Sequence, residues 1–310
     1  MKKPPEFKID LVYTWCDGTD PVFQAKKAKA MGSEFTFKGE LNGKHHILQA
    51  DELMYSLRSV EKNLPWINNI WIIVDEQLPD FLNIDNPKIH IVDMKDIFPS
   101  DALPNFNTNS IETVMGNIKG LSEYFILASD DMMVNKPLSP NYFYTEEKKP
   151  IIRVAKMWCG IFDLYSLQSY TANYENDKKV KKTCIQDCHN MTAHVKSDYN
   201  DIIENSSYKY LFKHTVYSKF RSYYCIQRIF IYFLLNKQNK VVFKYLGNNV
   251  FSAKRHKDQL YCESSYKWIV NLFRPNLFCM NASKHQKPKE IKKVRKFLNK
   301  KFRNKSQFEK

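Results

Sequence analysis

Four short apolar runs in the N-terminal half, with helix-like segments between them, constrain the fold of this chain more than any other feature. The runs are residues 9–15 (IDLVYTW), 69–75 (NIWIIVD), 88–93 (KIHIVD) and 124–128 (YFILA). A run that is apolar without interruption is typical of a strand buried on both faces of a sheet. Strands that alternate with helices predict an α/β fold, in which helices cover both faces of a mostly parallel sheet.

The chain divides into three predicted regions. Residues 1–150 form the α/β core, residues 151–282 form a less regular, helix-rich extension, and residues 283–310 form a basic amphipathic helix that begins near Pro288. Within the last two regions the pattern predicts helices at 197–205 and 222–236, a strand at 240–246, and an apolar helix face made of Ile291, Val294, Leu298 and Phe302.

The charge of the chain indicates which partners are attracted to it. The formal net charge is +15, and two thirds of the excess lies in residues 283–310, which contain 12 Lys and Arg against 2 Glu. A basic chain attracts nucleic acid, anionic membranes, nucleotide donors or acidic glycans. Because the basic residues concentrate in the tail and no nucleic-acid-binding motif appears, we expect no nucleic acid. The charge and amphipathic pattern of the tail predict peripheral contact of its cationic faces with an anionic membrane or a polyanionic glycan, and a solvated helix face is the alternative.

Cysteine usage and hydropathy predict where the protein works. The seven cysteines are an odd number without a framework spacing, which favours a reducing cytoplasm. The opening Met-Lys-Lys-Pro-Pro leads into a strand and lacks the apolar core of a signal peptide. The most apolar long segment, residues 225–235, is shorter than the roughly 20 residues of a spanning helix. We therefore predict a cytoplasmic protein, with peripheral contact at the inner face of the membrane.

Acidic and basic residues near the apolar runs are candidates for chemistry. Asp130 and Asp131 directly follow the last run, at the sheet edge where ligands bind in open α/β folds. Their oxygens suit Mg²⁺ or Mn²⁺ holding a diphosphate, although a solvated turn is the alternative. Asp10 lies inside the first run, where it either meets a cation or donor or faces water. Arg58 either pairs with Asp10, clamps a phosphate or is an exposed helix residue.

A second group of candidates lies in the C-terminal half. His189 titrates near neutral pH and is a candidate base for an acceptor hydroxyl, although a structural histidine is the alternative. Arg221 precedes a helical run and is a candidate for neutralising charge on a phosphoryl group. The segment also offers Cys184, Cys188 and His194 beside His189, but their spacing fits no standard zinc pattern.

The order of several motifs resembles a known family, the Stealth proteins. The segments IDLVYTWCDGTDP, ELMYSLRSVEKNLPWINNIWIIVDEQLPDFLN, VDMKDIFP, LPNFNTNSIET and GLSEYFILASDDMMVNKPLSPNYF, within residues 9–143, are similar to the first two conserved regions of that family. His189 with Lys196-Ser197 and Phe220-Arg221-Ser222 resembles the third region. The end of the chain, KFLNKKFRNKSQFEK, resembles the closing segment.

The resemblance implies a fold and a set of site residues. Stealth proteins include bacterial capsule and exopolysaccharide phosphotransferases, so the core is expected to be Rossmann-like, of the nucleotide-sugar transferase type, with the extension completing the active site. Met280-Asn281-Ala282 departs from the usual Leu-Asn-Asp, which leaves one expected acid missing. The implied catalytic residues are Asp10, Asp131, His189 and Arg221; the implied metal ligands are Asp130 and Asp131; the implied substrate contacts are Trp15, Asp17, Gly18, Arg58, Asn107, Asn109 and Asn281.

The reaction implied by the resemblance is transfer of a sugar-1-phosphate. A hydroxyl of a glycan or lipid-linked glycan attacks the β-phosphorus of a UDP-sugar, UMP leaves, and Mg²⁺ or Mn²⁺ with the arginines neutralises charge. The alternative within enzymes is an ordinary glycosyltransferase, in which the acceptor attacks C1 and UDP leaves. The alternative outside enzymes is a basic nucleic-acid-binding protein.

Overall fold

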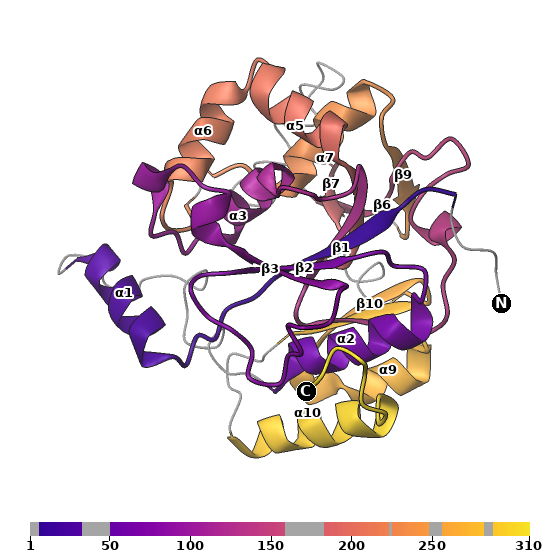
Figure 1. Ribbon diagram of the computed structural model, residues 1–310. Helices are drawn as coiled ribbons and strands as arrows, with labels where there is room; N and C mark the ends of the chain where they lie inside the picture. Colours follow the sequence, from indigo (N-terminus) through magenta and orange to yellow (C-terminus); the bar gives the residue numbers. More distant parts are fainter. Residues whose placement is uncertain (1–5, 33–49, 159–182, 223–224, 248–255, 282–287) are drawn as a thin grey trace.

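A five-stranded sheet lies at the centre of the molecule (Figure 1). The computed structural model describes residues 6–32, 50–158, 183–222, 225–247, 256–281 and 288–310. The strands are β1 (Ile9–Thr14), β2 (Ile70–Val74), β3 (Ile89–Asp93), β4 (Tyr124–Ser129) and β8 (Thr192–Val195). Their order is β3-β2-β1-β4-β8, and only β8 runs antiparallel to its neighbour. All four predicted runs form strands in a Rossmann-like order, so the predicted α/β class is confirmed.

Helices cover both faces of this sheet because successive side chains of a strand point to opposite faces. In β1, Val12 packs on one face, and Leu11 and Tyr13 pack on the other. The face of Leu11 and Tyr13 is covered by α2 (Glu52–Asn63). The face of Val12 is covered by α3 (Thr108–Val114), α5 (Lys196–Asn205), α6 (Lys209–Tyr217) and α7 (Arg228–Lys237), as Figure 1 shows.

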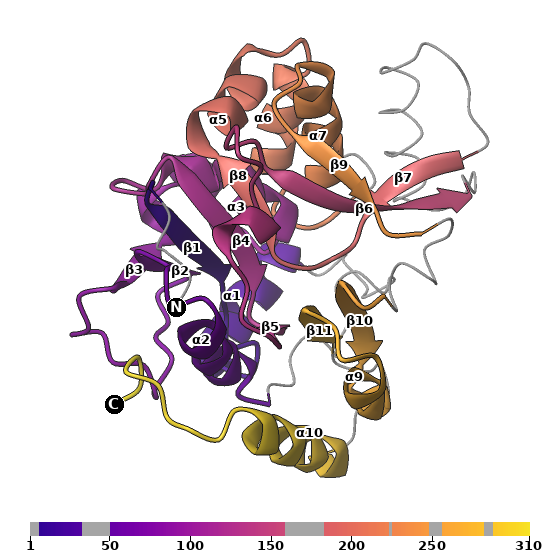
Figure 2. The ribbon, with the colours of Figure 1, turned by 90° about the vertical axis from the view of Figure 1, so that its right-hand side faces the viewer.

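Two smaller sheets flank the central one (Figure 2). The strands of the first are β10 (Gln259–Glu263), β11 (Leu277–Asn281) and β5 (Met132–Val134), paired in that order. Those of the second are β7 (Thr183–Asp187), β6 (Ile151–Trp158) and β9 (Val242–Tyr245), also in that order. The predicted strand at 240–246 is therefore present. Since β8 joins the central sheet and β5 pairs with β11, strand pairing crosses the predicted boundary at residue 150; the three-region division itself stays a prediction.

The remaining helices are α1 (Pro21–Met31), α9 (Trp268–Phe273) and α10 (Pro288–Lys301). α10 confirms the predicted amphipathic helix, because Val294, Leu298 and Phe302 are buried. α7 begins later than the predicted Ser222. The amide of Ile226, two residues before α7 begins, instead donates to Thr215 Oγ1 at 2.8 Å. Within the described ranges, none of the helices has the length and apolarity to cross a bilayer.

The last residues of the chain are held on α2 by Arg58. Its Nε and Nη2 donate to the two carboxylate oxygens of Glu309 at 2.9 and 2.6 Å, and Nη1 donates to the Phe302 carbonyl at 3.1 Å. Phe308 is buried beside this pair, against the same core as α2. A bidentate pair of this kind, with little solvent exposure, fixes the C-terminal segment in place. Arg58, expected to contact the substrate, is thus engaged with the end of the chain.

We predict that Arg58→Met and Glu309→Gln each lower the free energy of unfolding by about 2 kcal/mol, because each leaves one largely buried charge unpaired. The double variant should lose less than the sum of the two, and urea unfolding of all four proteins measures the difference. Burial opposes ionisation of Glu309, but hydrogen bonds from Arg58 and Ser306 outweigh it and hold its pKa below the ordinary value.

The contribution of this pair should therefore be complete above the unfolded-state pKa of Glu309, which is near 4.3, and should be lost as the pH falls through the lower folded-state value. Strictly additive losses at pH 7 would contradict the proposed pairing.

Candidate active site

The acidic pair Asp130-Asp131 forms the turn between β4 and β5, at the carboxyl edge of the parallel strands. Both residues are partly exposed there. The carbonyl of Asp131 accepts a hydrogen bond from the amide of Met280 on β11 at 2.9 Å. The turn is therefore held between the central sheet and the β10-β11-β5 sheet.

Three polar side chains of α2 hold β5 directly beyond this turn. Ser56 Oγ donates to the carbonyl of Met132, the amide of Val134 donates to Ser59 Oγ at 2.9 Å, and Asn63 Nδ2 donates to the carbonyl of Val134 at 2.7 Å. All three side chains are buried. Because buried polar groups need partners, this polar stripe on an otherwise apolar helix face fixes the height of the acidic turn above α2.

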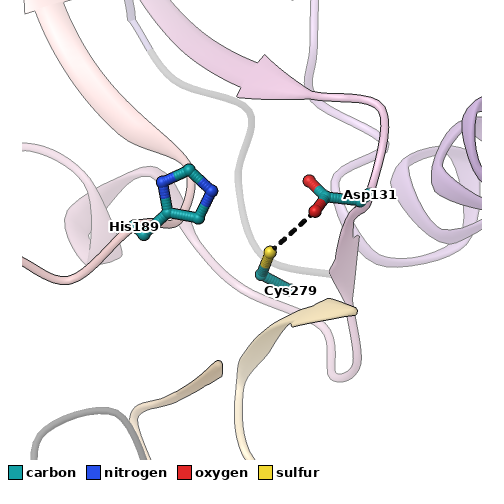
Figure 3. A group of neighbouring side chains, drawn as sticks. All are labelled: Asp131, His189 and Cys279. Atoms are coloured by element: carbon teal, nitrogen blue, oxygen red, sulfur yellow. Dashed lines mark hydrogen bonds between the residues drawn. The ribbon is translucent and has the colours of Figure 1, made fainter. Parts of the chain in front are cut away.

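Asp131 meets two side chains from distant parts of the chain (Figure 3). One atom each of Asp131, His189 and Cys279 that can bind a metal lies within 4.8 Å of the others. Cys279 Sγ donates to Asp131 Oδ2 at 3.1 Å, whereas the buried Oδ1 has no hydrogen-bond partner in the described part of the chain. The structure thus brings together two predicted site residues and one that the sequence did not suggest.

Burial and mutual repulsion perturb the titration of these groups. Burial, and then the charges of Asp131 and Glu52, raise the pKa of Asp130 well above the ordinary value. Burial, and to a smaller extent the charges of Asp131 and Asp51, raise the pKa of Glu52 at the start of α2 to about 7. Burial and the contact with Asp131 raise the pKa of the Cys279 thiol, so that it stays protonated and acts as a donor. Carboxylates gathered in this way attract cations.

His189 is oriented from its other side by Arg228. Arg228 Nη2 lies 3.3 Å from His189 Nδ1, and a guanidinium can only donate. Nδ1 must therefore accept, which leaves the proton of the neutral ring on Nε2. Burial and the Arg228 charge lower the pKa of His189, so the neutral ring is favoured at pH 7. In Figure 3 one ring nitrogen faces Asp131.

Arg228 is itself buried at the first position of α7, where the helix dipole disfavours a cation. Its Nε pairs with Asp187 Oδ2 at 2.7 Å and its Nη1 with Glu112 Oε1 at 3.2 Å. Burial opposes its charge, but Asp187 and Glu112 outweigh burial and raise the pKa of Arg228. Arg221 is partly buried close by: its charge adds to the lowering of the His189 pKa, and at Glu112 it opposes burial, which raises the pKa of that carboxyl.

Asp10 lies apart from this cluster, at the amino end of β1. Oδ1 accepts from Asn68 Nδ2 and the Asn69 amide at 2.8 and 3.1 Å, and Oδ2 accepts from Trp71 Nε1 and the Ser122 amide at 2.9 Å each. Asp10 pairs in register with Phe125, five positions before Asp130, which separates the two acids by about 16 Å at 3.3 Å per residue. The carboxylate of Asp10 is fully buried and satisfied by donors, as expected of a structural group.

The predicted substrate contacts after β1 lie at the same sheet edge as Asp130. Trp15 follows β1 directly. Asp17 Oδ1 accepts from the amide and hydroxyl of Thr19 at 2.8 and 2.6 Å, so it shapes its own turn. The buried Gly18 offers its carbonyl to Gln24 Nε2 at 3.0 Å.

The predicted contacts in the later segments have different positions. Asn107 is buried and caps α3 by accepting from the Asn109 amide at 3.1 Å, while its Nδ2 donates to the Ser218 carbonyl at 3.0 Å. Asn109 lies in the first turn of α3, the helix that also carries Glu112. The backbone of Asn281 ends β11, and its side chain lies outside the described residues.

Among the described side chains, Cys188, His189 and His194 do not form a metal-binding group of the alternative zinc type. His194 is buried, stacks on Phe125 with ring centroids 5.0 Å apart, and lies 3.2 Å from Thr192 Oγ1. Burial lowers the pKa of His194 to about 3, as in a neutral core histidine. Cys188 is buried with Ala155 and Leu246, and the side chain of Cys184 lies outside the described residues.

Sequence reasoning missed Cys279, Arg228, Glu112 and Asp187. Cys279 lies within the strand β11, where a buried cysteine is compatible with the apolar residues around it. Arg228 is the first residue of an apolar helix. Neither residue belongs to a local pattern that would distinguish it as functional. The one available signal was the presence of a charge inside a segment that is otherwise apolar, because such a charge requires buried partners.

The donor set decides which metal fits. Carboxylate oxygens of Asp130 and Asp131 suit Mg²⁺ or Mn²⁺, and the buried Asp131 Oδ1 has an acceptor site to offer. The mixed set with His189 and Cys279 suits softer metals instead, but a protonated thiol that donates to Asp131 is not a thiolate ligand. The acidic part of the site therefore fits the predicted hard cation better than the complete cluster does.

These features define an α/β protein with a candidate acid and histidine site at the carboxyl edge of a Rossmann-like sheet. Residues 7–34 match the family model for Stealth protein CR1, conserved region 1, and residues 46–152 match that for Stealth protein CR2, conserved region 2. The N-terminal half of the chain therefore matches the first two conserved regions of the Stealth family, as its motifs predicted. The likeness of residues 189–222 and 296–310 to the later regions stays a prediction.

Curated relatives carry names that agree with this family. The chain is 35% identical over 181 residues to a receptor polysaccharide phosphotransferase of Streptococcus oralis, covering 56% of this chain and 54% of the relative. It is 33% identical over 181 residues to a capsular polysaccharide phosphotransferase of Streptococcus pneumoniae, with the same two coverages. The chain thus spans about half the length of these curated relatives.

Solved structures resemble the chain more distantly. An inositol-1-phosphate CTP transferase from T. maritima aligns with a TM-score of 0.44 and 11% identity, covering 96% of this chain and 98% of that one. A galactosyltransferase in complex with donor and acceptor sugar analogues aligns with a TM-score of 0.44 and 12% identity, covering 94% and 95%.

We predict that Asp131→Asn weakens Mn²⁺ binding at least about ten-fold, because it removes one charge and one anionic oxygen from the acidic turn. Electron paramagnetic resonance of free Mn²⁺ during a titration measures the affinity. Asp80→Asn is the matched control, because Asp80 is exposed on the loop after β2. Unchanged affinity in Asp131→Asn would place the cation elsewhere, and an equal loss in Cys279→Ser would show that sulfur is a ligand.

Proposed function

We propose that the protein transfers a sugar-1-phosphate from a UDP-sugar to a hydroxyl of a glycan or lipid-linked glycan, in the synthesis of a capsule or other surface polysaccharide. The match of residues 7–34 and 46–152 to two conserved regions of the Stealth family and the names of the relatives support this proposal. The observation that carries it is the meeting of Asp131 and His189, which two distant segments contribute to one sheet edge. A cytoplasmic location remains a prediction from the sequence.

The proposed reaction breaks one phosphorus–oxygen bond and forms another. The acceptor oxygen attacks the β-phosphorus of the donor, the bond from that phosphorus to the bridging oxygen breaks, and UMP leaves with the bridging oxygen. The bond between C1 of the sugar and its oxygen is retained, so the anomeric configuration is unchanged. The hydroxyl proton passes to a base or to water.

The residues of the site divide this work by charge. Asp130 and Asp131 would hold Mg²⁺ or Mn²⁺, which neutralises phosphate charge when bound. Arg221 would stabilise the negative charge that spreads over the phosphoryl oxygens in the transition state. Arg228 does not need to touch substrate, because each of its three side-chain nitrogens already has a protein partner, in Asp187, Glu112 or His189.

The tautomer of His189 revises its proposed role. A base at Nε2 needs a free lone pair there, but the Arg228 contact occupies the lone pair of Nδ1 and leaves the proton on Nε2. We therefore propose that His189 donates from Nε2 to a phosphoryl oxygen, where a positioned donor stabilises developing charge. The lowered pKa suits this role, because a neutral donor does not compete with the cation for the acidic turn.

We predict that His189→Ala lowers kcat about 100-fold, as the loss of a single oxyanion donor does. His189→Gln should keep at least about a tenth of wild-type kcat, because the Gln amide retains a donor near the position of Nε2. Steady-state release of nucleotide measures both variants. Equal losses in the Gln and Ala variants would contradict the donor role and favour a base.

The product of the reaction separates phosphotransfer from ordinary glycosyl transfer. We predict that incubation with UDP-sugar, acceptor and Mg²⁺ releases UMP, and that the product contains a phosphodiester whose phosphorus derives from the donor. Liquid chromatography with mass spectrometry distinguishes UMP from UDP across a panel of UDP-sugars. UDP as the main acceptor-dependent product would overturn the phosphotransferase proposal and leave a glycosyltransferase.

A further inference from the structure

One end of the molecule combines exposed apolar side chains with a basic helix face. Figures 1 and 2 both place α9 and α10 at this end, and Lys267 beside α9 pairs with Glu290 of α10 at 4.0 Å. Tyr266, Trp268 and Leu272 are 51%, 59% and 67% exposed. Trp268 and Leu272 are four residues apart on α9, so they lie on the same helix face.

The apolar face of α10 points into the protein. Val294 and Leu298 are buried with Phe278 of β11, so the helix cannot insert that face into another phase without leaving the core. The outward face of α10 is basic. The exposed basic residues of α10 are Lys289, Lys292, Lys293, Arg295, Lys296 and Lys300. Two of these residues are paired with acids: Lys293 with Glu290 at 2.9 Å and Arg295 with Asp51 at 2.7 Å. The two acids therefore neutralise only part of the positive charge of this face.

We propose that this end, formed by Tyr266, Trp268 and Leu272 together with the basic face of α10, docks on an anionic lipid bilayer. Lysines and arginines attract an anionic bilayer surface, while tryptophan and tyrosine favour the interface and leucine favours the acyl region. A polyanionic glycan would account for the charge and for stacking on Trp268, but it offers nothing apolar to Leu272. The combination therefore favours lipid.

Docking at this end also places the candidate site relative to the bilayer. α9 connects β10 to β11 along the chain, and β11 carries Cys279 beside Asp131. The proposed lipid contact on α9 and the candidate site at Asp131 are thus both attached to the β10-β11-β5 sheet. Docking on a bilayer is independent of the proposed transfer reaction, because it concerns the location of the protein and does not depend on which reaction takes place at Asp131.

The test is co-sedimentation of the full chain with phosphatidylcholine vesicles, with and without about one third phosphatidylglycerol. One variant, Trp268→Ser with Leu272→Ser, removes the apolar part, and a second, Lys292→Glu with Lys296→Glu, reverses two charges. Matched controls lie on α6, at the opposite end of Figure 1, where Tyr210 and Leu211 are 76% and 43% exposed and Lys209 and Lys213 are exposed. The controls are Tyr210→Ser with Leu211→Ser, and Lys209→Glu with Lys213→Glu.

We expect the wild type to bind anionic vesicles at least about ten-fold more tightly than neutral ones, and each α9 or α10 variant to lose about ten-fold, with the α6 controls unchanged. Equal binding to both vesicle types, or equal losses in the α6 controls, would overturn the proposal. Binding of a soluble anionic polysaccharide that depends on Lys292 and Lys296 but not on Leu272, without vesicle binding, would assign the surface to a glycan instead. UMP release with a soluble acceptor, measured on the same variants, separates this result from the proposed reaction.

Discussion

The anchoring of β5 is the constraint on which the rest of the site depends. This strand is only three residues long, yet it is bound by the buried polar stripe of α2 on one side and by β11 on the other. A strand satisfied on both sides cannot slide, because a shift of one residue would leave several buried backbone groups without partners. The turn before it is therefore fixed as well, and Asp131 meets Cys279 across the boundary between two sheets.

A second constraint is electrostatic and centres on Arg228. A cation buried at a helix N-terminus is unfavourable unless carboxylates surround it, and here two acids from α3 and β7 do so. The third nitrogen of the guanidinium, Nη2, reaches His189 and selects its tautomer. The ion pairs that make the burial of Arg228 tolerable thus also hold it where its Nη2 selects the tautomer of the imidazole. The position of the acidic turn is set by hydrogen bonds to the backbone of β5. The orientation and tautomer of His189 are set by the ion-pair network of Arg228.

Much of the fold was predictable from sequence, and part of the site was. The four apolar runs and the amphipathic helix at 288–301 form as expected. A strand buried on two faces requires a continuous apolar run, and a helix buried along one stripe requires apolar residues three or four positions apart, so both patterns are visible in the sequence. Asp131 was predictable from its position after a strand. The placements of Asp10 and Arg58 were not, because a charge in an apolar segment shows that it needs partners but not which ones it finds. Asp10 found backbone and side-chain donors, and Arg58 found Glu309 at the end of the chain.

The sequence by itself determined the four core strands, their mostly parallel arrangement and the match to two Stealth regions, since these depend on local periodicity and on ordered motifs. Only the tertiary structure decided that Cys279 and His189 meet Asp131, that Arg228 holds His189, and that α10 turns its lysines outward. These outcomes depend on contacts between residues tens to hundreds of positions apart. Their energies are those of burying and pairing charges, and such energies depend on position in space, which no local pattern of residues encodes.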